Sequence, residues 1–359
     1  MPDSTDHLKT VAAIRKRAPM YIGALDSHGM MYAVCEAVGN SVDQFLMQKA
    51  TRITITVESD RLTVTVRDDG DGLPFEKPSA GDYDSLATEW LTLIHSSPTA
   101  DGHAPHVHLP SFHGIGIVAL NAVSKHFECQ SWREGALWMQ RFHCGVPEAS
   151  PVVLERGHGR GTEIRFTLDA DLFGDARIDI DSFRDFLAER VHLFHGLLID
   201  FNSERLYARR GLATLAESML QNIDHDDATW SNRSAFHMNQ TYDDMIIHAA
   251  AAGCGTTTTW RAWANCRLMP KGGTHQSAFQ DAVADCSWTP SVGLIHVMMK
   301  DAEYTGSTIE RLNMPHFRER IAKRIRSHLH SWCVGIGISA LQPSRPPVDS
   351  DFTESRTIL

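Results

Sequence analysis

The sequence predicts an α+β fold, and two patterns along the chain indicate it. Short runs in which apolar and polar residues alternate, typical of half-buried strands, recur along the chain. Between them lie longer segments whose apolar residues recur at helical spacing, as in residues 31–49. Glycine-rich turns stand where predicted strands meet helices. The length of 359 residues favours two domains over one.

The composition is that of a globular protein, with 42% hydrophobic residues and a net charge of −10. This charge has the wrong sign for a protein that wraps phosphate backbones, although local basic patches are not excluded. Because the chain has neither a run of about 18 apolar residues nor a signal-peptide core, we expect a cytoplasmic protein with no membrane partner. Seven cysteines without a CxxC pair indicate reduced, mostly buried thiols.

Residues 31–49 predict a helix with two distinct faces. Its apolar stripe consists of Val34, Val38, Val42 and Phe45. On another face Glu36, Asn40 and Asp43 follow one another at i, i+4 and i+7. Burying three polar groups without partners would cost a few kcal/mol. The three polar residues on this face therefore indicate a functional site.

A hairpin is predicted next, since residues 51–58 and 61–69 both alternate. Its second strand runs into the acidic glycine turn "RDDGDGLPF" at 67–75. Residues 84–95 predict a short helix capped by Asp84. A loop over 96–112 then leads to an apolar helix that begins near Gly114 and Gly116.

Further strands and helices are predicted along the rest of the chain. Strands are expected in 127–134, 137–144, 161–168 and 197–208, and an amphipathic helix within 175–195. Residues 212–332 predict a second α/β unit that ends in a basic helix. The Pro/Ser/Asp-rich tail is expected to be disordered.

One loop is unusually rich in histidine. It contains His95, His103, His106, His108 and His113. A transition-metal site is one interpretation, because neutral imidazoles bind such ions well. The Pro/Gly/Ser-rich composition and the lack of a cysteine or paired carboxylate at ligand spacing favour a solvated loop instead.

Seven stretches in register carry a family resemblance. They are "IRKRAPMYIG" (14–23), "EAVGNSVDQ" (36–44), "RDDGDGLP" (67–74), "FHGIGIVALNAVS" (112–124), "WREG" (132–135), "GRGTEIRF" (159–166) and "PKGGTHQSAF" (270–279). Together they resemble the GHKL ATPase superfamily, most closely the N-terminal ATPase and transducer region of gyrase B and ParE-type topoisomerase subunits. The resemblance implies a GHKL (Bergerat) ATP-binding α/β sandwich over 1–205, a smaller α/β transducer-like domain of ribosomal S5 type over 206–335, and a tail over 336–359.

The resemblance also implies ATP and Mg²⁺ as ligands and a role for each site residue. Glu36 is expected to be the general base for the attacking water, Asn40 the magnesium ligand and Asp43 a nucleotide-pocket residue. Asp68 would accept a hydrogen bond from the adenine amino group, with Thr162 supporting it. The other implied nucleotide-binding residues are Gly70, Gly72, Leu73 and Pro74 around the base, His113, Gly114, Ile115 and Gly116 at the phosphates, and Arg133 at the rim.

Three positions depart from the family pattern. Residues 304–312 place Ile309 where relatives carry a lysine for the γ-phosphate, and Arg311 or Lys300 could replace it. Gln44 and Asp71 stand where relatives have an acid–arginine pair, so a more acidic rim is expected. The sequence leaves open whether Asp71 pairs with Gln44 or with a cation.

Three functions are compatible with these residues. The first is a stand-alone ATPase that hydrolyses Mg-ATP and forms a homodimer, although the N-terminal arm for such dimerisation is short. The second is an ATP-dependent enzyme that activates or phosphorylates a small-molecule acceptor. The third is a non-catalytic, gyrase-like decoy that binds a protein partner. Since nothing after residue 333 could form a TOPRIM domain, no DNA cleavage is expected.

Overall fold

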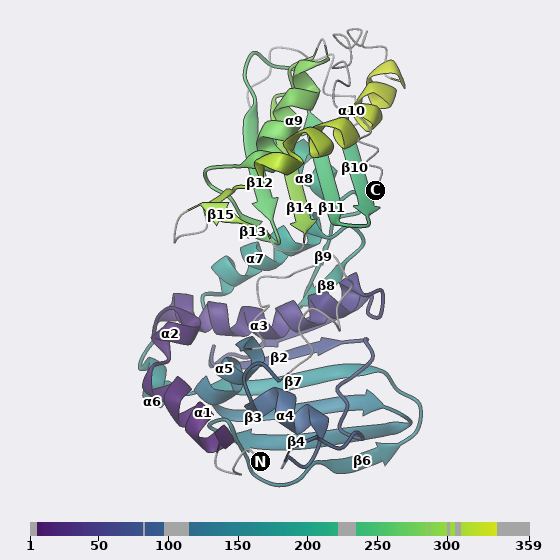
Figure 1. Cartoon of the computed structure of the whole chain (residues 1–359). Coiled ribbons are helices and arrows are strands. Elements are labelled where there is room, and N and C mark those ends of the chain that lie inside the picture. Colours follow the sequence, from purple (N-terminus) through teal and green to yellow (C-terminus); the bar gives the residue numbers. More distant parts are fainter. Residues whose placement is uncertain are drawn as a thin grey trace, which may run out of the picture.

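The computed structural model describes residues 6–81, 83–96, 115–221, 235–286, 288–299, 302–305 and 310–335. Its described elements form two sheets with helices packed against them, so the predicted α+β class is confirmed. The larger sheet lies at the bottom of Figure 1 and the smaller one at the top, with α3 (Ser27–Leu46) and α7 (Ile180–Leu193) between them.

The larger sheet has nine strands among the described residues, in the order β5-β4-β3-β7-β2-β1-β8-β9, with β6 also paired to β4. Most neighbours are antiparallel, but β1 and β8 run parallel. The strands are β1 (Arg52–Val57), β2 (Thr63–Asp68), β3 (Ser124–Arg133), β4 (Ala136–His143), β5 (Val146–Pro147), β6 (Val152–Arg156), β7 (Gly161–Leu168), β8 (Leu198–Phe201) and β9 (Glu204–Tyr207).

Alternating burial explains why these segments form one sheet with a single covered face. In β1, Ile53, Ile55 and Val57 are buried while the residues between them are half-buried or exposed. The predicted hairpin is confirmed as β1 and β2, which pair from Ile53↔Asp68 to Val57↔Val64. The short strands β5 and β6 were not predicted.

Helix α3 crosses the buried face of this sheet. It begins at Ser27, four residues before the predicted start, because the Asp26 side chain caps it by accepting hydrogen bonds from the backbone N–H groups of His28 and Gly29. Three members of the predicted apolar stripe, Val34, Val38 and Val42, are buried in the core. Phe45 is half-buried and packs against the same core.

Three more helices lie on the same side of the larger sheet: α1 (Asp6–Lys16), α4 (Leu86–Thr92) and α5 (Gly116–Val123). The predicted cap of the helix in 84–95 is wrong: the Ser85 side chain, not Asp84, accepts the hydrogen bond from the backbone N–H of Thr88. Two single-turn helices, α2 (Pro19–Ile22) and α6 (Ala170–Phe173), complete this part of the chain.

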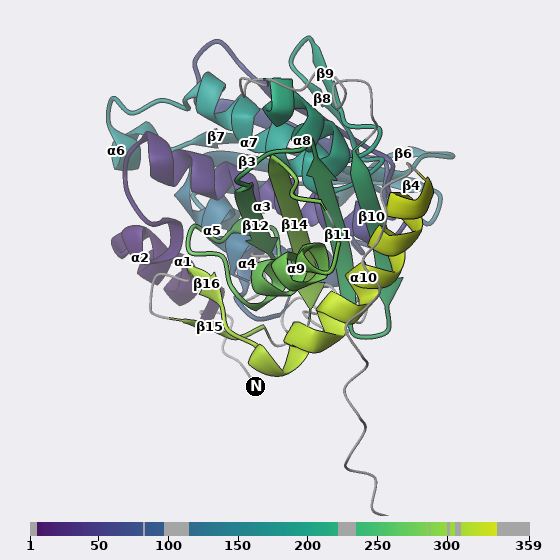
Figure 2. The same ribbon diagram turned by 90° about the horizontal axis from the view of Figure 1, so that it is seen from above.

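The smaller sheet is covered on both faces, as Figure 2 shows from above. Its strands are β10 (Phe236–Tyr242), β11 (Met245–Ala252), β12 (Thr259–Ala264), β13 (Arg267–Leu268) and β14 (Val292–Met299), and a separate two-stranded ribbon joins β15 (Tyr304–Thr305) to β16 (Arg311–Leu312). Ala250 and Ala252 of β11 join the core that includes residues of α8 (Leu212–Gln221). Ile247, Ala249 and Ala251 face the core under α9 (Thr274–Ala284) and α10 (Arg318–Gly335). A 3-10 turn, Pro315–Phe317, leads into α10.

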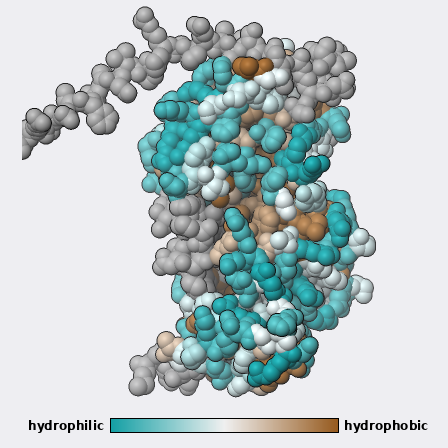
Figure 3. Space-filling view, turned by 90° about the vertical axis from the view of Figure 1, so that its right-hand side faces the viewer, coloured by the Kyte–Doolittle hydropathy of each residue, from teal (hydrophilic) through white to brown (hydrophobic). Residues whose placement is uncertain are grey.

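Two expectations about the chain's chemistry can be compared with the described residues. All seven cysteines are free, but three are buried and four only half-buried, so the prediction of mostly buried thiols is wrong. Among the described helices, none is long and apolar enough to cross a membrane. One face of the molecule carries an apolar area at about the height of α3 and α7, between two hydrophilic ends (Figure 3).

Candidate functional site

The polar face of α3 lies inward, towards the other elements of the larger sheet's covered side. Glu36 is 8% exposed and Asp43 is 9% exposed, while Asn40 between them is half-buried. The three residues thus share one helix face, as their spacing predicts. Two acids are withdrawn from water on this face.

Glu36 meets the first residue of α5 at very close range. A Cβ added to Gly116 would lie 1.9 Å from Glu36 Oε2, so only glycine allows this approach. The same oxygen is buried and has no hydrogen-bond partner among the described residues. Burial raises the pKa of Glu36 to about 7. A buried carboxyl with this pKa can accept and release a proton near neutral pH.

Asp43 lies two turns along the same face and is perturbed in the same direction. Burial, and secondarily the charge of Glu36, raise the pKa of Asp43 well above its usual range. The half-buried Asn40 side chain supplies an uncharged amide oxygen between the two acids. This helix face therefore combines one uncharged oxygen ligand, from Asn40, with two carboxyls whose raised pKa values favour protonation.

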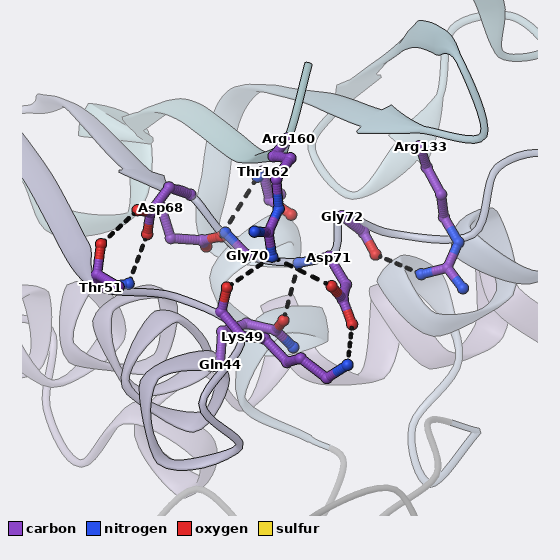
Figure 4. Close-up of polar contacts among 11 residues, drawn as sticks. Gln44, Lys49, Thr51, Asp68, Gly70, Asp71, Gly72, Arg133, Arg160 and Thr162 are labelled. Carbon is purple, nitrogen blue, oxygen red and sulfur yellow. Dashed lines mark hydrogen bonds and ion pairs between the residues drawn. The ribbon is translucent and has the colours of Figure 1, made fainter. Parts of the chain in front are cut away.

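Asp68, the last residue of β2, is anchored on both carboxylate oxygens. Its Oδ2 accepts a hydrogen bond from the Ser41 hydroxyl at 2.9 Å. Its Oδ1 accepts from the backbone N–H of Gly70 at 2.9 Å and of Thr162 at 3.4 Å (Figure 4). Burial raises the pKa of Asp68, and these hydrogen bonds oppose that shift. The carboxylate is therefore held in one orientation beside α3.

The glycine turn after Asp68 packs tightly against β3. Gly72 has a φ of +77°, and an added Cβ would lie 2.5 Å from the backbone oxygen of Trp132. The Leu73 backbone N–H donates to the Ser131 hydroxyl at 2.6 Å. After the turn, Leu73 is half-buried and Pro74 is buried. The turn is thus fixed against the sheet by contacts that only this backbone path permits.

Arg133 reaches the same turn from the end of β3. Its Nη1 donates to the backbone oxygen of Gly72 at 2.9 Å, and its Nε lies 2.9 Å from Glu76 Oε1. Arg133 therefore braces the turn at the edge of the sheet, as drawn at the right of Figure 4.

The structure shows whether Asp71 pairs with Gln44 or with a cation. Its backbone N–H donates to Gln44 Oε1 at 3.1 Å, while its carboxylate lies 3.3 Å from Lys49 Nζ and 3.5 Å from an Arg160 nitrogen (Figure 4). Asp71 thus contacts both Gln44 and two cations. Lys49 and Arg160 offset the charge of Asp71, and the expectation that the rim is more acidic than in relatives stays a prediction.

The predicted phosphate-binding segment is described only in part. Gly116 begins α5, and Ile115 precedes it without a side-chain cap. His113, Gly114 and the rest of residues 97–114 lie outside the described residues, as do Lys300 and Ile309. The structure therefore brings together Glu36, Asn40, Asp43, Asp68, Gly70, Gly72, Thr162, Arg133 and Gly116 around α3 and the glycine turn.

Several residues that shape this site were missed by the sequence reasoning. They are Ser41, Ser131, Glu76, Lys49 and Arg160. Ser41 and Arg160 lie inside quoted motifs, so their positions beside Asn40 and Thr162 were available signals. Ser131 contacts Leu73 across 58 positions of sequence, a pairing that no local pattern reveals.

Comparisons with known proteins identify relatives of this chain. Residues 25–172 match the family of histidine kinase-, DNA gyrase B- and HSP90-like ATPases. The chain is 34% identical over 294 residues to the DNA gyrase B protein of Haloferax volcanii, a match that covers 77% of this chain and 44% of that protein. It is 30% identical over 302 residues to the DNA gyrase B protein of Rickettsia typhi, covering 78% and 35%. The chain thus spans less than half the length of these relatives.

The fold has solved counterparts as well. The 43K ATPase domain of Thermus thermophilus gyrase B, in complex with an aminocoumarin, superimposes with a TM-score of 0.78 at 20% identity, over 93% of each chain. The topoisomerase IV ATP-binding domain of Francisella tularensis, in complex with a small-molecule inhibitor, gives a TM-score of 0.71 at 20% identity. The chain belongs to the GHKL ATPase family and is homologous to the N-terminal ATPase region of the B proteins of DNA gyrase and topoisomerase IV.

Proposed function

We propose that this chain binds Mg-ATP in the space bounded by α3, the glycine turn and the start of α5, and hydrolyses it to ADP and phosphate. The observation that carries the proposal is Glu36. Its carboxyl is buried, has a pKa of about 7, and has one oxygen without a hydrogen-bond partner among the described residues. Such a group is unfavourable for stability and suited to proton transfer.

Asp68 is the proposed acceptor for the adenine amino group. A carboxylate offers about four lone-pair sites, and the described donors to Asp68 are Ser41, Gly70 and Thr162. One site is therefore left for an exocyclic amine. The half-buried Leu73 and the buried Pro74 would form apolar walls for the base, and Arg133 would close the rim by bracing Gly72.

Asn40 is the proposed magnesium ligand. The donor chemistry fits, because Mg²⁺ prefers oxygen ligands and is usually bound through one or two protein oxygens together with substrate phosphates. When bound, the ion would offset the negative charge of the phosphates. Ile115, Gly116 and the preceding residues His113 and Gly114 would face the phosphates, as the resemblance implies, with Asp43 deeper in the pocket.

Glu36 is the proposed general base. Its carboxylate would orient a water molecule and take its proton as that oxygen attacks the γ-phosphate. A base with a pKa near 7 combines a substantial ionised fraction with useful proton affinity at neutral pH. The close contact with Gly116 holds the carboxyl beside the start of α5, where the phosphates would bind.

The two sheets support a division into an ATP-binding domain over 1–205 and a transducer-like domain over 206–335, which remains a prediction. The described strands of the first sheet end at Tyr207, and those of the second begin at Phe236. Whether the chain acts alone or forms a homodimer can be measured by light scattering with and without a non-hydrolysable ATP analogue.

The test is phosphate release from Mg-ATP by the purified chain, with the nucleotide products resolved. We expect ADP, and at least about a 100-fold loss of turnover in Glu36→Ala. Glu319→Ala is a matched control, since Glu319 is an exposed helical glutamate on α10. Turnover unchanged in Glu36→Ala would contradict the role of Glu36. If ATP raises the melting temperature but no phosphate is released, the chain binds the nucleotide, and hydrolysis by the chain alone is refuted.

A further inference from the structure

A second cluster of ligand-type side chains lies on the other face of the larger sheet, away from α3. His126, His143 and Glu148 are all exposed, and one ligand atom from each lies within 4.8 Å of the other two. In β3 and β4 the alternation turns Phe127 and Phe142 into the core, so His126 and His143 point away from it. The nucleotide site has no part in this cluster.

The backbone fixes the two histidines directly opposite each other. His126 of β3 pairs with His143 of β4 in the antiparallel ladder, and their ring centroids are 5.4 Å apart. On its other side β3 has a register shift against β7 between Ser124 and His126. Such a bulge turns the neighbouring side chain in a new direction. The imidazole pair is therefore set by strand register.

Glu148 joins the pair from the next segment of the same sheet. Its backbone N–H donates to the backbone oxygen of Arg141 at 2.9 Å, which places it beside β4, next to His143. The tight turn that returns the chain uses Cys144 and Gly145, both with positive φ. Three neighbouring backbone segments thus present two imidazoles and one carboxylate to the same spot.

Two arginines lie beside the cluster, and both form ion pairs with nearby carboxylates. The Arg141 guanidinium donates to Glu128 at 2.6 Å, and Arg165 pairs with Glu58. Both arginines thus pair with carboxylates outside the cluster, and Arg141 also interacts electrostatically with Glu148. Together with His126 and Glu148 of the cluster, they line an open depression of about 250 Å³. An ion bound there would have access from solvent and space for a water ligand.

Two imidazole nitrogens and one carboxylate oxygen form a ligand set that suits zinc and related divalent ions. With bonds of about 2.0–2.1 Å, tetrahedral ligand atoms are roughly 3.3 Å apart. Closing from the observed limit of 4.8 Å needs only rotation of three exposed side chains on a fixed backbone. We propose that His126, His143 and Glu148 bind one divalent transition-metal ion of the zinc class, with water in the fourth position.

The test is a titration of the tag-free, EDTA-treated chain with Zn²⁺ at pH 7.5, followed by calorimetry, with Co²⁺ absorption as a second readout. Because the chain has 20 histidines, the informative quantity is the difference between variants. Relative to wild type, His126→Asn/His143→Asn should lose one equivalent of metal. Glu148→Gln should raise the Kd of that equivalent at least about 10-fold.

The matched control is His237→Asn, which removes an exposed histidine from a strand of the smaller sheet. It should keep the full stoichiometry, and all variants should show the wild-type melting temperature in EDTA. The same number of equivalents at the same Kd in the double variant and in wild type would overturn the proposal. No binding of Zn²⁺ by the wild-type chain would also overturn it.

Discussion

The acids around α3 and the acids under α10 are treated in opposite ways by this fold. Around α3, Glu36, Asp43 and Asp68 are buried and each has a raised pKa, with burial the largest cause. Beneath α10, Asp281 accepts two hydrogen bonds from Arg318, and this interaction lowers its pKa. Arg326 likewise pairs with Asp285.

The difference separates buried acids, whose pKa values are raised, from exposed acids that form ion pairs on the surface. An acid whose pKa is raised on folding destabilises the folded protein at neutral pH, because the unfolded chain ionises it more easily. Exposed ion pairs contribute little in either direction. The fold therefore carries an energetic cost at α3 that packing elsewhere must offset, and such sites are typically functional.

The largest expected effect on ATP affinity comes from Asp68. Asp68→Asn replaces the proposed acceptor for the adenine amine, so the Kd for ATP should rise at least about 30-fold, equivalent to about 2 kcal/mol. Asp69→Asn is the control, because Asp69 is directed to Thr51 and Arg52 instead. Calorimetric titration with a non-hydrolysable ATP analogue measures both. Equal losses of affinity would place base recognition elsewhere.

A buried histidine beside the smaller sheet shows the opposite pH dependence from the acids around α3. His275, in the first turn of α9, is fully buried, and both ring nitrogens lack hydrogen-bond partners among the described residues. Burial lowers the pKa of His275 to about 3. As the pH falls, His275 is protonated in the unfolded chain before it is protonated in the folded chain. The contribution of His275 to the free energy of unfolding is therefore complete above about pH 6.5 and falls as the pH drops towards 3.

The wild-type chain should therefore lose about 2 kcal/mol from His275 between pH 7.5 and pH 5. His275→Leu should lack this contribution, so its free energy of unfolding should change less between the two pH values. Urea unfolding of both proteins at pH 7.5 and pH 5 measures the difference. Identical pH dependences would show that His275 is not held neutral by burial.

The smallest expected effect belongs to the surface pair. Arg318 and Asp281 have side-chain exposures of 53% and 32%, so solvent and salt screen their attraction. Arg318→Ala should lower the melting temperature by no more than about 2 °C. Thermal unfolding at low and high salt checks this. A large, salt-sensitive drop in melting temperature would contradict the view that this exposed ion pair contributes little to stability.

Local patterns predicted much of the fold. The alternation in 51–58 and 61–69 defines the hairpin because strand side chains have a period of two. The i, i+4, i+7 spacing of Glu36, Asn40 and Asp43 places them on one helix face for a similar reason. β6 was missed because it is a short edge strand whose Val152 and Leu154 are exposed, so it lacks a buried face.

Contacts between distant segments were beyond the reach of the sequence. Glu36 packs on Gly116 only because α3 and α5 lie side by side on the sheet. The Asp71–Arg160 contact spans 89 positions and depends on the order in which the strands assemble. Glycine, acid and helix positions could thus be predicted, whereas burial and pairing at the site depend on the assembled sheet.

The most direct measurement pairs stability and turnover in Glu36→Gln at pH 8. At this pH the folded chain bears the full effect of the Glu36 pKa, raised from 4.5 to about 7. Replacing the carboxylate with an amide should raise the free energy of unfolding by about 3 kcal/mol. The same variant should lose ATP turnover at least about 100-fold. A variant that is less stable than wild type, or hydrolyses ATP equally well, would contradict the claim that α3 holds a buried acid for catalysis.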